Sequence, residues 1–420
     1  MSRRAILWVA FALVHVGVAT LGFVLPNQPM GDVYLVYEPW SNRALDGAGI
    51  VGITEGWVYP QLALVPMVLA HGLSWIGGYT IGWVLLVTLC DALAFGLLVG
   101  RARSRGRCVA AWFWLASIAL LGPIALYRID AITVPLAIAG CLWLVGRPWL
   151  GSILLAVATW IKVWPAALLA AAVIAVRRRL AVVGGAIVVS TLTLGAVAAA
   201  GGLRYAFGFI GDQTGRGLQL EAPISTLYLW RAVARIDGSF IYYDPDMLTF
   251  QVTGPNVDVV VALMTPLLVL AVGAVAVLGA MKARRGASFA VLFPPLALAL
   301  VTGFIAFNKV GSPQYLTWIV VPLVTGLVLD RRRWRSPAAL ALLIAALTQL
   351  VYPLTYSGLL AAQPLPAALL TARNLLVVVL FVWAVVRLAR VPVRSASGVA
   401  AARDASLRAA RSRPASRSVR

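Results

Sequence analysis

The chain has 420 residues, of which 61% are hydrophobic and 12% charged, and its mean hydropathy is +0.91. Soluble domains carry about 25% charged residues, so this composition excludes a soluble globular protein. The net charge of +21 does not indicate nucleic-acid binding, because the arginines lie in short runs between apolar segments, as basic loops that flank membrane spans do. We therefore expect membrane lipids, and no nucleic acid, among the partners.

Apolar runs recur along the whole chain and predict membrane spans. A run of about 17–25 residues can cross roughly 30 Å of hydrocarbon as a helix, whereas a transmembrane barrel would show alternating segments of about ten residues. The first run, at 5–25, has no small-residue cleavage pattern before Pro26 and is read as a retained span. The expected fold class is an all-α polytopic membrane protein.

Runs of basic residues between the apolar segments predict the orientation. They lie at 3–4, 101–107, 177–179, 282–285, 331–335 and from 387 onward. We place all of them in the cytoplasm, because cytoplasmic loops are enriched in arginine. A crossing at 59–76 would export the four arginines of 101–107, and an arginine costs about 2.5–3.5 kcal/mol at the membrane centre. We therefore predict that 59–76 is a helix that lies in, or re-enters, the outer leaflet.

The remaining apolar segments then alternate across the membrane, and both termini are cytoplasmic. The predicted spans lie at about 5–25, 79–99, 108–127, 131–146, 148–163, 164–176, 180–201, 258–280, 287–306, 315–329, 336–355 and 367–389. The large outer loops are 31–60 and 202–257, and residues 227–236 in the second loop are predicted to form an interfacial amphipathic helix. Residues 391–420, rich in Arg, Ala and Ser, are expected to be a disordered cytoplasmic tail after a membrane domain at 1–390.

The acidic residues provide a check on this topology, because it rests on basic residues alone. Eleven of the fourteen acids fall on the outer side. They are Asp32, Glu38, Asp46, Glu55, Asp130, Asp212, Glu221, Asp237, Asp244, Asp246 and Asp258. Asp91 instead lies within a span, where an acid is costly and usually faces protein. The outer side is therefore where we expect the polar chemistry.

Asp32 follows the first span directly and is the candidate catalytic residue. As a general base it would take a proton from an acceptor hydroxyl, a role worth about 10²- to 10⁴-fold. As a turn or helix-capping residue after Gly31 it would have no chemical role. Its spacing leaves both interpretations open. Glu38 lies in the same outer stretch.

Further candidates stand where apolar segments end. Arg128 and Asp130 emerge together, either as a snorkelling arginine paired with its neighbour or as functional groups. Lys162 is one of three lysines in the chain and lies beside Trp160 and Trp164. It is either an ordinary interfacial lysine or a phosphate ligand at the headgroup level.

Two polar clusters suit phosphate and sugar binding through cationic, amide and hydroxyl groups, although polar loops without function can look alike. One cluster contains Asp212, Gln213, Arg216, Gln219 and Glu221, and the other contains Asn308, Lys309, Ser312, Gln314 and Tyr315. Cys90, Cys108 and Cys141 read as packing residues, and His15 and His71 do not suggest a metal pair. We expect no metal site and no cofactor.

An ordered set of motifs resembles glycosyltransferase family 87. The motifs are GDVYLVY (31–37) followed by an apolar helix that starts YP (59–60), RID (128–130), IKVWP (161–165), RGLQLE (216–221) and FNKVGSPQYLTWIV (307–320). The resemblance extends from about residue 5 to residue 390. Members of this family are GT-C-fold membrane enzymes of actinobacteria that use polyprenyl-phosphate mannose.

The resemblance implies a GT-C-like bundle of about twelve transmembrane helices with a large first extracytoplasmic loop and a juxtamembrane helix at 59–76. It also implies that Asp32 is the general base of an inverting transfer, in which a hexose, expected to be mannose, moves from a polyprenyl-phosphate donor to an envelope glycolipid or glycan outside the cell membrane. Tyr59 and Gln61 flank a single proline where the family usually shows two, which bears on acceptor choice.

Other functions stay open from the residues alone. A transporter or a flippase of lipid-linked sugars would place its functional charges near the bilayer midplane, where Asp91 fits. A noncatalytic scaffold of an envelope complex would need no outer acid for its activity.

Overall fold

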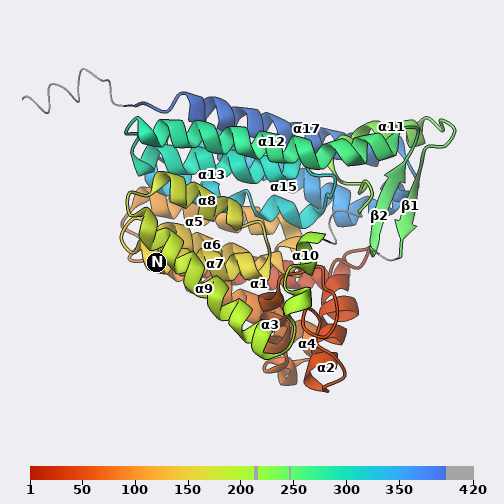
Figure 1. The fold of residues 1–420 in the computed structure, drawn as a ribbon, viewed down its shortest axis with the longest axis horizontal. Coiled ribbons are helices and arrows are strands. Elements are labelled where there is room, and N and C mark those ends of the chain that lie inside the picture. The colour runs from red at the N-terminus through yellow and green to blue at the C-terminus, as the bar shows by residue number, and fades with distance from the viewer. Residues whose placement is uncertain (212–215, 246, 394–420) are drawn as a thin grey trace, which may run out of the picture.

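The computed structural model describes residues 1–211, 216–245 and 247–393, and the predicted tail lies outside the described residues from position 394 onward. The chain is 73% helical with almost no sheet, which confirms an all-α polytopic membrane protein. In Figure 1 the long helices run side by side, and the N-terminus lies at the end of the bundle opposite to the small hairpin of β1 and β2.

Eight helical segments are long and apolar enough to cross a membrane. They are α1 (Arg3–Val24), α4 (Tyr79–Val99), α5 with η4 (Arg105–Ala125), α9 (Arg179–Ala199), α12 (Val257–Arg284), α13 (Phe289–Ala306), α15 with η8 (Arg335–Leu354) and α17 (Pro364–Ala389). Shorter apolar helices are α6 (Asp130–Trp143), α7 (Pro148–Ile161), α8 (Ala166–Ala175) and α14 (Val320–Leu329), the last preceded by η7 (Pro313–Thr317). Each of the twelve predicted spans therefore coincides with a helical segment.

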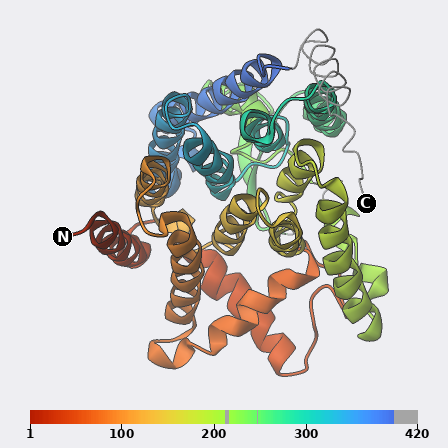
Figure 2. The same ribbon diagram turned by 90° about the vertical axis from the view of Figure 1, so that its left-hand side faces the viewer.

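Burial differs strongly among these helices and shows which of them form the centre. In the apolar stretch of α13, 78% of the residues are buried, against 11% in that of α12 and 28% in that of α1. Figure 2, which looks along the helices, shows α1 standing at the edge of the bundle. The exposed apolar side chains of α1 and α12 fit contact with lipid tails rather than with protein.

Close approach of α6 and α7 depends on two glycines. A Cβ atom at Gly151 would lie 2.7 Å from the carbonyl oxygen of Gly140, and one at Gly140 would lie 3.0 Å from that of Gly151. Small residues of this kind let helix backbones pack closely inside a membrane, where no hydrophobic driving force brings the helices together. The pair fixes α6, which starts at Asp130, against α7, which ends at Ile161.

The first outer stretch is more ordered than the predicted loop at 31–60. Residues 33–45 are helical, as η1 (Val33–Tyr37) and α2 (Glu38–Leu45). The helix predicted at 59–76 consists of η2 (Gln61–Ala63), α3 (Leu64–His71) and η3 (Ser74–Ile76). Eight residues of α3 rise about 12 Å, too little to cross the hydrocarbon. Its exposed Leu69 and the exposed Trp75 of η3 suit contact with the outer leaflet, which stays a prediction.

The second outer stretch contains a hairpin that the sequence did not predict. Antiparallel strands β1 (Phe240–Asp244) and β2 (Thr249–Thr253) pair in the register Phe240 to Thr253. The predicted helix at 227–236 is present as α11 (Thr226–Val233), which packs on β1 and α17, and its place at the membrane interface stays a prediction. The minor elements of this region are η5 (Leu203–Tyr205), α10 (Gly208–Gly211), η6 (Pro223–Ser225) and α16 (Tyr356–Leu360).

Two buried ion pairs join distant parts of the fold. The Nε2 atom of His15 lies 3.0 Å from Oδ2 of Asp91, which links α1 to α4 and confirms that this acid faces protein. The guanidinium of Arg373 on α17 lies 2.9 Å from Glu221 and also donates to the backbone carbonyl of Glu221. The second pair fixes the segment before α11 to the bundle.

We expect Arg373→Met to reduce the free energy of unfolding by about 3–5 kcal/mol, because it leaves the buried Glu221 carboxylate unpaired. The double variant Glu221→Leu, Arg373→Met should recover most of the loss, since neither charge then stays buried. Reversible unfolding in detergent measures both. Arg333→Met, which breaks an exposed pair with Asp330, is the control and should change stability little. A single variant as stable as the wild type would contradict the expectation.

Candidate functional site

Asp32 lies at the corner between α1 and η1, and its carboxylate forms an ion pair. Its Oδ1 atom pairs with Nη1 of Arg128, and its Oδ2 atom accepts a hydrogen bond of 3.4 Å from the hydroxyl of Tyr37. The side chain is 33% exposed and makes no helix-capping hydrogen bond, so the turn or capping role does not account for it. One carboxylate oxygen is held by a cation, the other by a long hydrogen bond, and the side chain as a whole is partly exposed.

Arg128 occupies the turn between η4 and α6 and is almost fully buried. It pairs with Asp32 instead of with its neighbour Asp130, the pairing that the snorkelling interpretation had offered. Its Nη2 atom donates to the hydroxyl of Tyr352 at 3.3 Å. Burial alone would lower the pKa of Arg128, but Asp32 and Tyr352 outweigh it and the pKa is raised, so the guanidinium stays charged.

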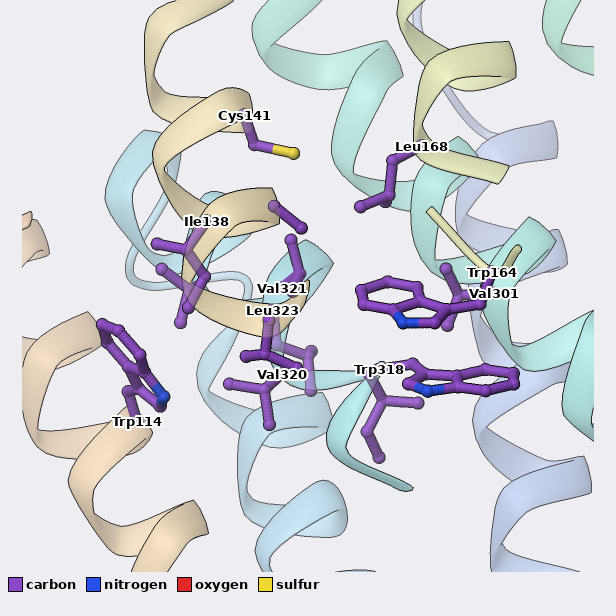
Figure 3. Close-up of a cluster of buried hydrophobic side chains, with 14 of the residues drawn as sticks. Trp114, Ile138, Cys141, Trp164, Leu168, Val301, Trp318, Val320, Val321 and Leu323 are labelled. Atoms are coloured by element: carbon purple, nitrogen blue, oxygen red, sulfur yellow. The ribbon is translucent and has the colours of Figure 1, made fainter. Parts of the chain in front are cut away.

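Asp130 opens α6 and is fully buried. Its Oδ1 atom accepts a hydrogen bond of 2.6 Å from the indole of Trp318, while Oδ2 has no hydrogen-bond partner among the described residues. Figure 3 shows the ring of Trp164 stacked parallel on that of Trp318, with 5.5 Å between centroids and 7° between planes. The indole of Trp164 donates in turn to Thr133, so the two tryptophans hold the first turn of α6.

Lys162 stands in the turn between α7 and α8. Its ammonium lies 4.1 Å from the centroid of the Tyr59 ring, a cation–π contact. Burial lowers the pKa of Lys162, Asp130 raises it, and Arg216 lowers it again. Asp32 and Arg128 act on the same amine in smaller measure.

The candidate acids and cations therefore converge from distant parts of the sequence. Asp32 comes from the first corner, Arg128 and Asp130 from the turn before α6, Lys162 from the turn after α7, and Arg216 from the segment before the hairpin. Tyr59 joins them, because burial and then Asp32 and Asp130 raise the pKa of its hydroxyl. This group of residues is called the charged cluster below.

The second polar motif lies beside the charged cluster. Burial and then Arg216 lower the pKa of Lys309. Tyr315 stacks on Trp318 with 4.1 Å between ring centroids. Gln314 is buried and accepts a hydrogen bond of 2.7 Å from the hydroxyl of Ser312. Tyr315 thus lies on the side of the cluster where Trp318 holds Asp130, and Lys309 lies on the side of Arg216.

Several candidates bind protein groups and support the site instead. The side-chain Oε1 atom of Gln219 accepts a hydrogen bond of 3.1 Å from the backbone N–H of Gly311. The backbone N–H of Gln219 donates to the carbonyl of Lys309 at 3.0 Å. Glu221 is held by Arg373, as described above. The side chain of Asn308 accepts from the backbone of Val310, a local turn. Asp212 and Gln213 lie outside the described residues.

The first outer stretch contributes aromatic rings to the site. Trp40, Trp57 and Tyr59 meet edge to face, with centroid separations of 5.5, 5.6 and 5.9 Å. Glu38 starts α2, and its carbonyl accepts from Ser41 at 3.0 Å; none of the interactions that define the charged cluster involves its side chain. We therefore set Glu38 apart from the cluster.

Sequence reasoning missed Tyr37, Tyr352 and Trp318, which hold the charged side chains in place. Tyr37 lies five residues after Asp32, and its hydroxyl also accepts from the backbone N–H of Ile129 at 3.0 Å. The one signal for Tyr37 in the sequence was its place in the motif GDVYLVY, close to Asp32. Trp318 stands in the motif at 307–320, which carried no role for it, and Tyr352 lies in an apolar segment where nothing in the sequence distinguishes it from other core aromatics.

Comparison with known proteins gives one match. The model of Glycosyltransferase family 87 matches residues 57–293 of the chain, more than half of its length. The matched range includes Arg128, Asp130, Lys162 and Arg216, whereas Asp32 precedes it. No curated protein and no solved structure matches the chain.

We expect Asp130→Asn to lower the pKa of Lys162 further, because the carboxylate opposes the effect of burial on that amine. Since a lysine amine acylates only when neutral, half-labelling of Lys162 by acetic anhydride should move to lower pH, as read by mass spectrometry. Asp32→Asn should shift it less. Lys282, at the far end of α12, is the control; an unchanged Lys162, or an equal shift at Lys282, would contradict the assignment.

Proposed function

The chain belongs to glycosyltransferase family 87 and is a membrane glycosyltransferase, and on that premise we propose that it transfers a hexose, mannose in the first instance, from a polyprenyl-phosphate donor to an acceptor hydroxyl. The acceptor is an envelope glycolipid or glycan. The observation that carries this proposal is the charged cluster, which sets one partly exposed carboxylate beside the buried Arg128 and the partly buried Lys162 and Arg216. Such a transfer needs both, because a proton leaves the acceptor while negative charge develops on a phosphate.

In the proposed reaction Asp32 is the general base. Its Oδ1 atom is held by Arg128, so Oδ2 is the oxygen that takes the acceptor proton. The acceptor oxygen attacks the anomeric carbon on the face opposite to the phosphate, and the new glycosidic bond forms with inversion. The bond between the anomeric carbon and the phosphate oxygen breaks with its electron pair, and polyprenyl phosphate leaves with one more negative charge than it had in the donor.

The cations of the cluster are proposed to receive that charge. Arg216 acts electrostatically on both Lys162 and Lys309, and we propose that the three face one phosphate group. Fixed cations stabilise a developing charge without reorganising at the moment of reaction. Because these side chains supply the positive charge, the proposed mechanism uses no metal ion and no cofactor.

Support for the sugar contacts comes from the aromatic and amide groups around the cluster. Tyr315 lies on Trp318 beside the buried Asp130, and its partly exposed ring is the group that we assign to the sugar. Tyr59 lies between the charged cluster and the aromatic rings of the first outer stretch. We place the acceptor on that side of Asp32.

The proposed side of the membrane is the outer one. The basic runs lie in the loops that we assign to the cytoplasm. The charged cluster is built from the loops at the other ends of the helices, which we assign to the outer side. Both termini are then cytoplasmic, and the protein is a multi-pass protein of the cell membrane.

We expect Asp32→Asn to reduce transfer by about 10²- to 10⁴-fold and to leave donor binding nearly unchanged, because the amide cannot take the acceptor proton and the phosphate contacts stay. The purified protein is incubated with polyprenyl-phosphate mannose and a panel of envelope glycolipids, and products are read by mass spectrometry. Asp46→Asn, an exposed acid of the same stretch, is the matched control. A fully active Asp32→Asn variant would remove this residue from the mechanism.

Labelling of single cysteines should show that the charged cluster lies on the outer side of the membrane. In a variant without Cys90, Cys108 and Cys141, a cysteine at Gly47 should react with a membrane-impermeant maleimide in intact cells, whereas a cysteine at Arg178 should react only after permeabilisation. Both positions are exposed at the surface of the protein, so the difference reports the membrane side. The reverse pattern would refute the proposed location of the reaction.

A further inference from the structure

The corner that leads from α1 to Asp32 has an unfavourable backbone conformation. Asn27 and Gln28 have φ angles of 61° and 49°, in the left-handed region that residues with a side chain rarely adopt. Two such residues in succession persist only where the surrounding structure determines them. The corner therefore depends on contacts from outside its own segment.

Those contacts come from the end of η8 and the start of α16, more than 320 residues away in the sequence. The side-chain amide of Asn27 donates to the carbonyl of Pro353 at 2.7 Å, and its Oδ1 atom accepts from the hydroxyl of Ser357 at 2.7 Å. The hydroxyl of Tyr352 donates toward the carbonyl of Asn27, at 3.1 Å. Three hydrogen bonds thus fix one residue of the corner.

The same Tyr352 hydroxyl accepts the hydrogen bond from Nη2 of Arg128, and the guanidinium lies 5.8 Å from the centroid of the Tyr352 ring. The other terminal nitrogen of the guanidinium, Nη1, pairs with Asp32. One hydroxyl group therefore connects the backbone that precedes Asp32 with the cation that binds it. Both routes end on the same carboxylate.

We propose that Tyr352 is a positioning residue of the transfer reaction: it holds Arg128 and the α1–η1 corner together, so that Oδ2 of Asp32 faces the acceptor. The inference rests on the proposed function, because it presupposes that Asp32 is the base. Tyr352 acts through Arg128 and Asn27 and touches neither the donor nor the acceptor.

This arrangement separates the effect of Tyr352 on turnover from its effect on donor binding. Without the hydroxyl, Arg128 is held through Nη1 alone and the corner loses one of its three bonds. The carboxylate of Asp32 then spends less time in the productive orientation, and small misplacements of a reacting group cost rate. The donor phosphate contacts Lys162 and Arg216 in the proposed mechanism, and neither residue is bonded to Tyr352.

We expect Tyr352→Phe to lower kcat by about 10- to 100-fold, the size of one hydrogen bond to a charged group, with the KM of polyprenyl-phosphate mannose changed less than about twofold. Tyr356→Phe removes the same group four residues away, from a ring that meets the Tyr352 ring edge to face at 4.9 Å and bonds neither Arg128 nor Asn27. It should retain wild-type turnover. Equal turnover of the wild type and Tyr352→Phe overturns the proposal.

A double-mutant cycle tests whether Tyr352 acts through Arg128. In an Arg128→Met background, Tyr352→Phe should cause a smaller further loss of kcat than in the wild type, because the hydroxyl then keeps only its bond to the carbonyl of Asn27. A loss as large as in the wild-type background would show that Tyr352 supports the fold generally, and would overturn the positioning role.

Hydrogen exchange gives a readout that needs no turnover. Tyr352→Phe should raise amide exchange in residues 25–37 and 127–130, with the other described segments unchanged, and Tyr356→Phe should raise neither. Should Tyr352→Phe fail to fold, Ser357→Ala decides: it removes one neutral bond to Asn27 and should raise exchange in 25–37 and lower kcat by about 3- to 10-fold. Unchanged exchange in that variant overturns the proposal that these hydrogen bonds hold the α1–η1 corner. A wild-type protein that transfers no hexose would overturn the proposed function, while the exchange data would still decide whether Tyr352 holds the corner.

Discussion

The ion pair between Asp32 and Arg128 is the contact around which this end of the helical bundle is arranged. Arg128 is buried, so an unpaired guanidinium there would cost several kcal/mol. The pair removes that cost and joins the end of α1 to the start of α6. Tyr352 and Tyr37 attach η8 and η1 to the same two side chains. Three segments, the α1–η1 corner, the turn before α6 and η8, therefore meet at this ion pair.

Burial gives the neighbouring charges their chemical character. Lys162 is desolvated and faces other cations, which lower its pKa, and Asp130 partly restores it. Asp130 itself is held by the indole of Trp318, which stacks on Trp164. An anionic phosphate near Lys162 would relieve the repulsion among the cations and favour the charged amine. The site is thus polarised before substrate arrives, as electrostatic preorganisation requires.

A support made of backbone contacts holds the cations at the far side. Gln219 pairs with the chain around Lys309 and Gly311, and the residues on either side of it pair with β2. Position 311 requires glycine, because a Cβ atom there would lie 2.1 Å from the backbone nitrogen of Ala222. The hairpin and the buried pair of Glu221 and Arg373 therefore set the place of Arg216 and Lys309, although they lie outside the cluster.

The sequence by itself determined the helices, the membrane class and a large part of the candidate site. Hydrocarbon about 30 Å thick demands long apolar runs, and a helix satisfies its backbone hydrogen bonds locally, so each span can be read from its own residues. The scarcity of charge made Asp32, Arg128, Asp130 and Lys162 conspicuous. The family resemblance then gave them an order along the chain and an expected chemistry.

Only the tertiary structure decided which of these groups meet. Arg128 pairs with Asp32 and not with its neighbour, Asp91 finds His15, and Tyr352 reaches Arg128 across 224 positions. The hairpin and the supporting roles of Gln219 and Glu221 also lay beyond the sequence. The physical reason is that a charge buried in an apolar bundle takes whichever partner helix packing brings within hydrogen-bond distance, and that packing is a property of the whole bundle and not of any one segment.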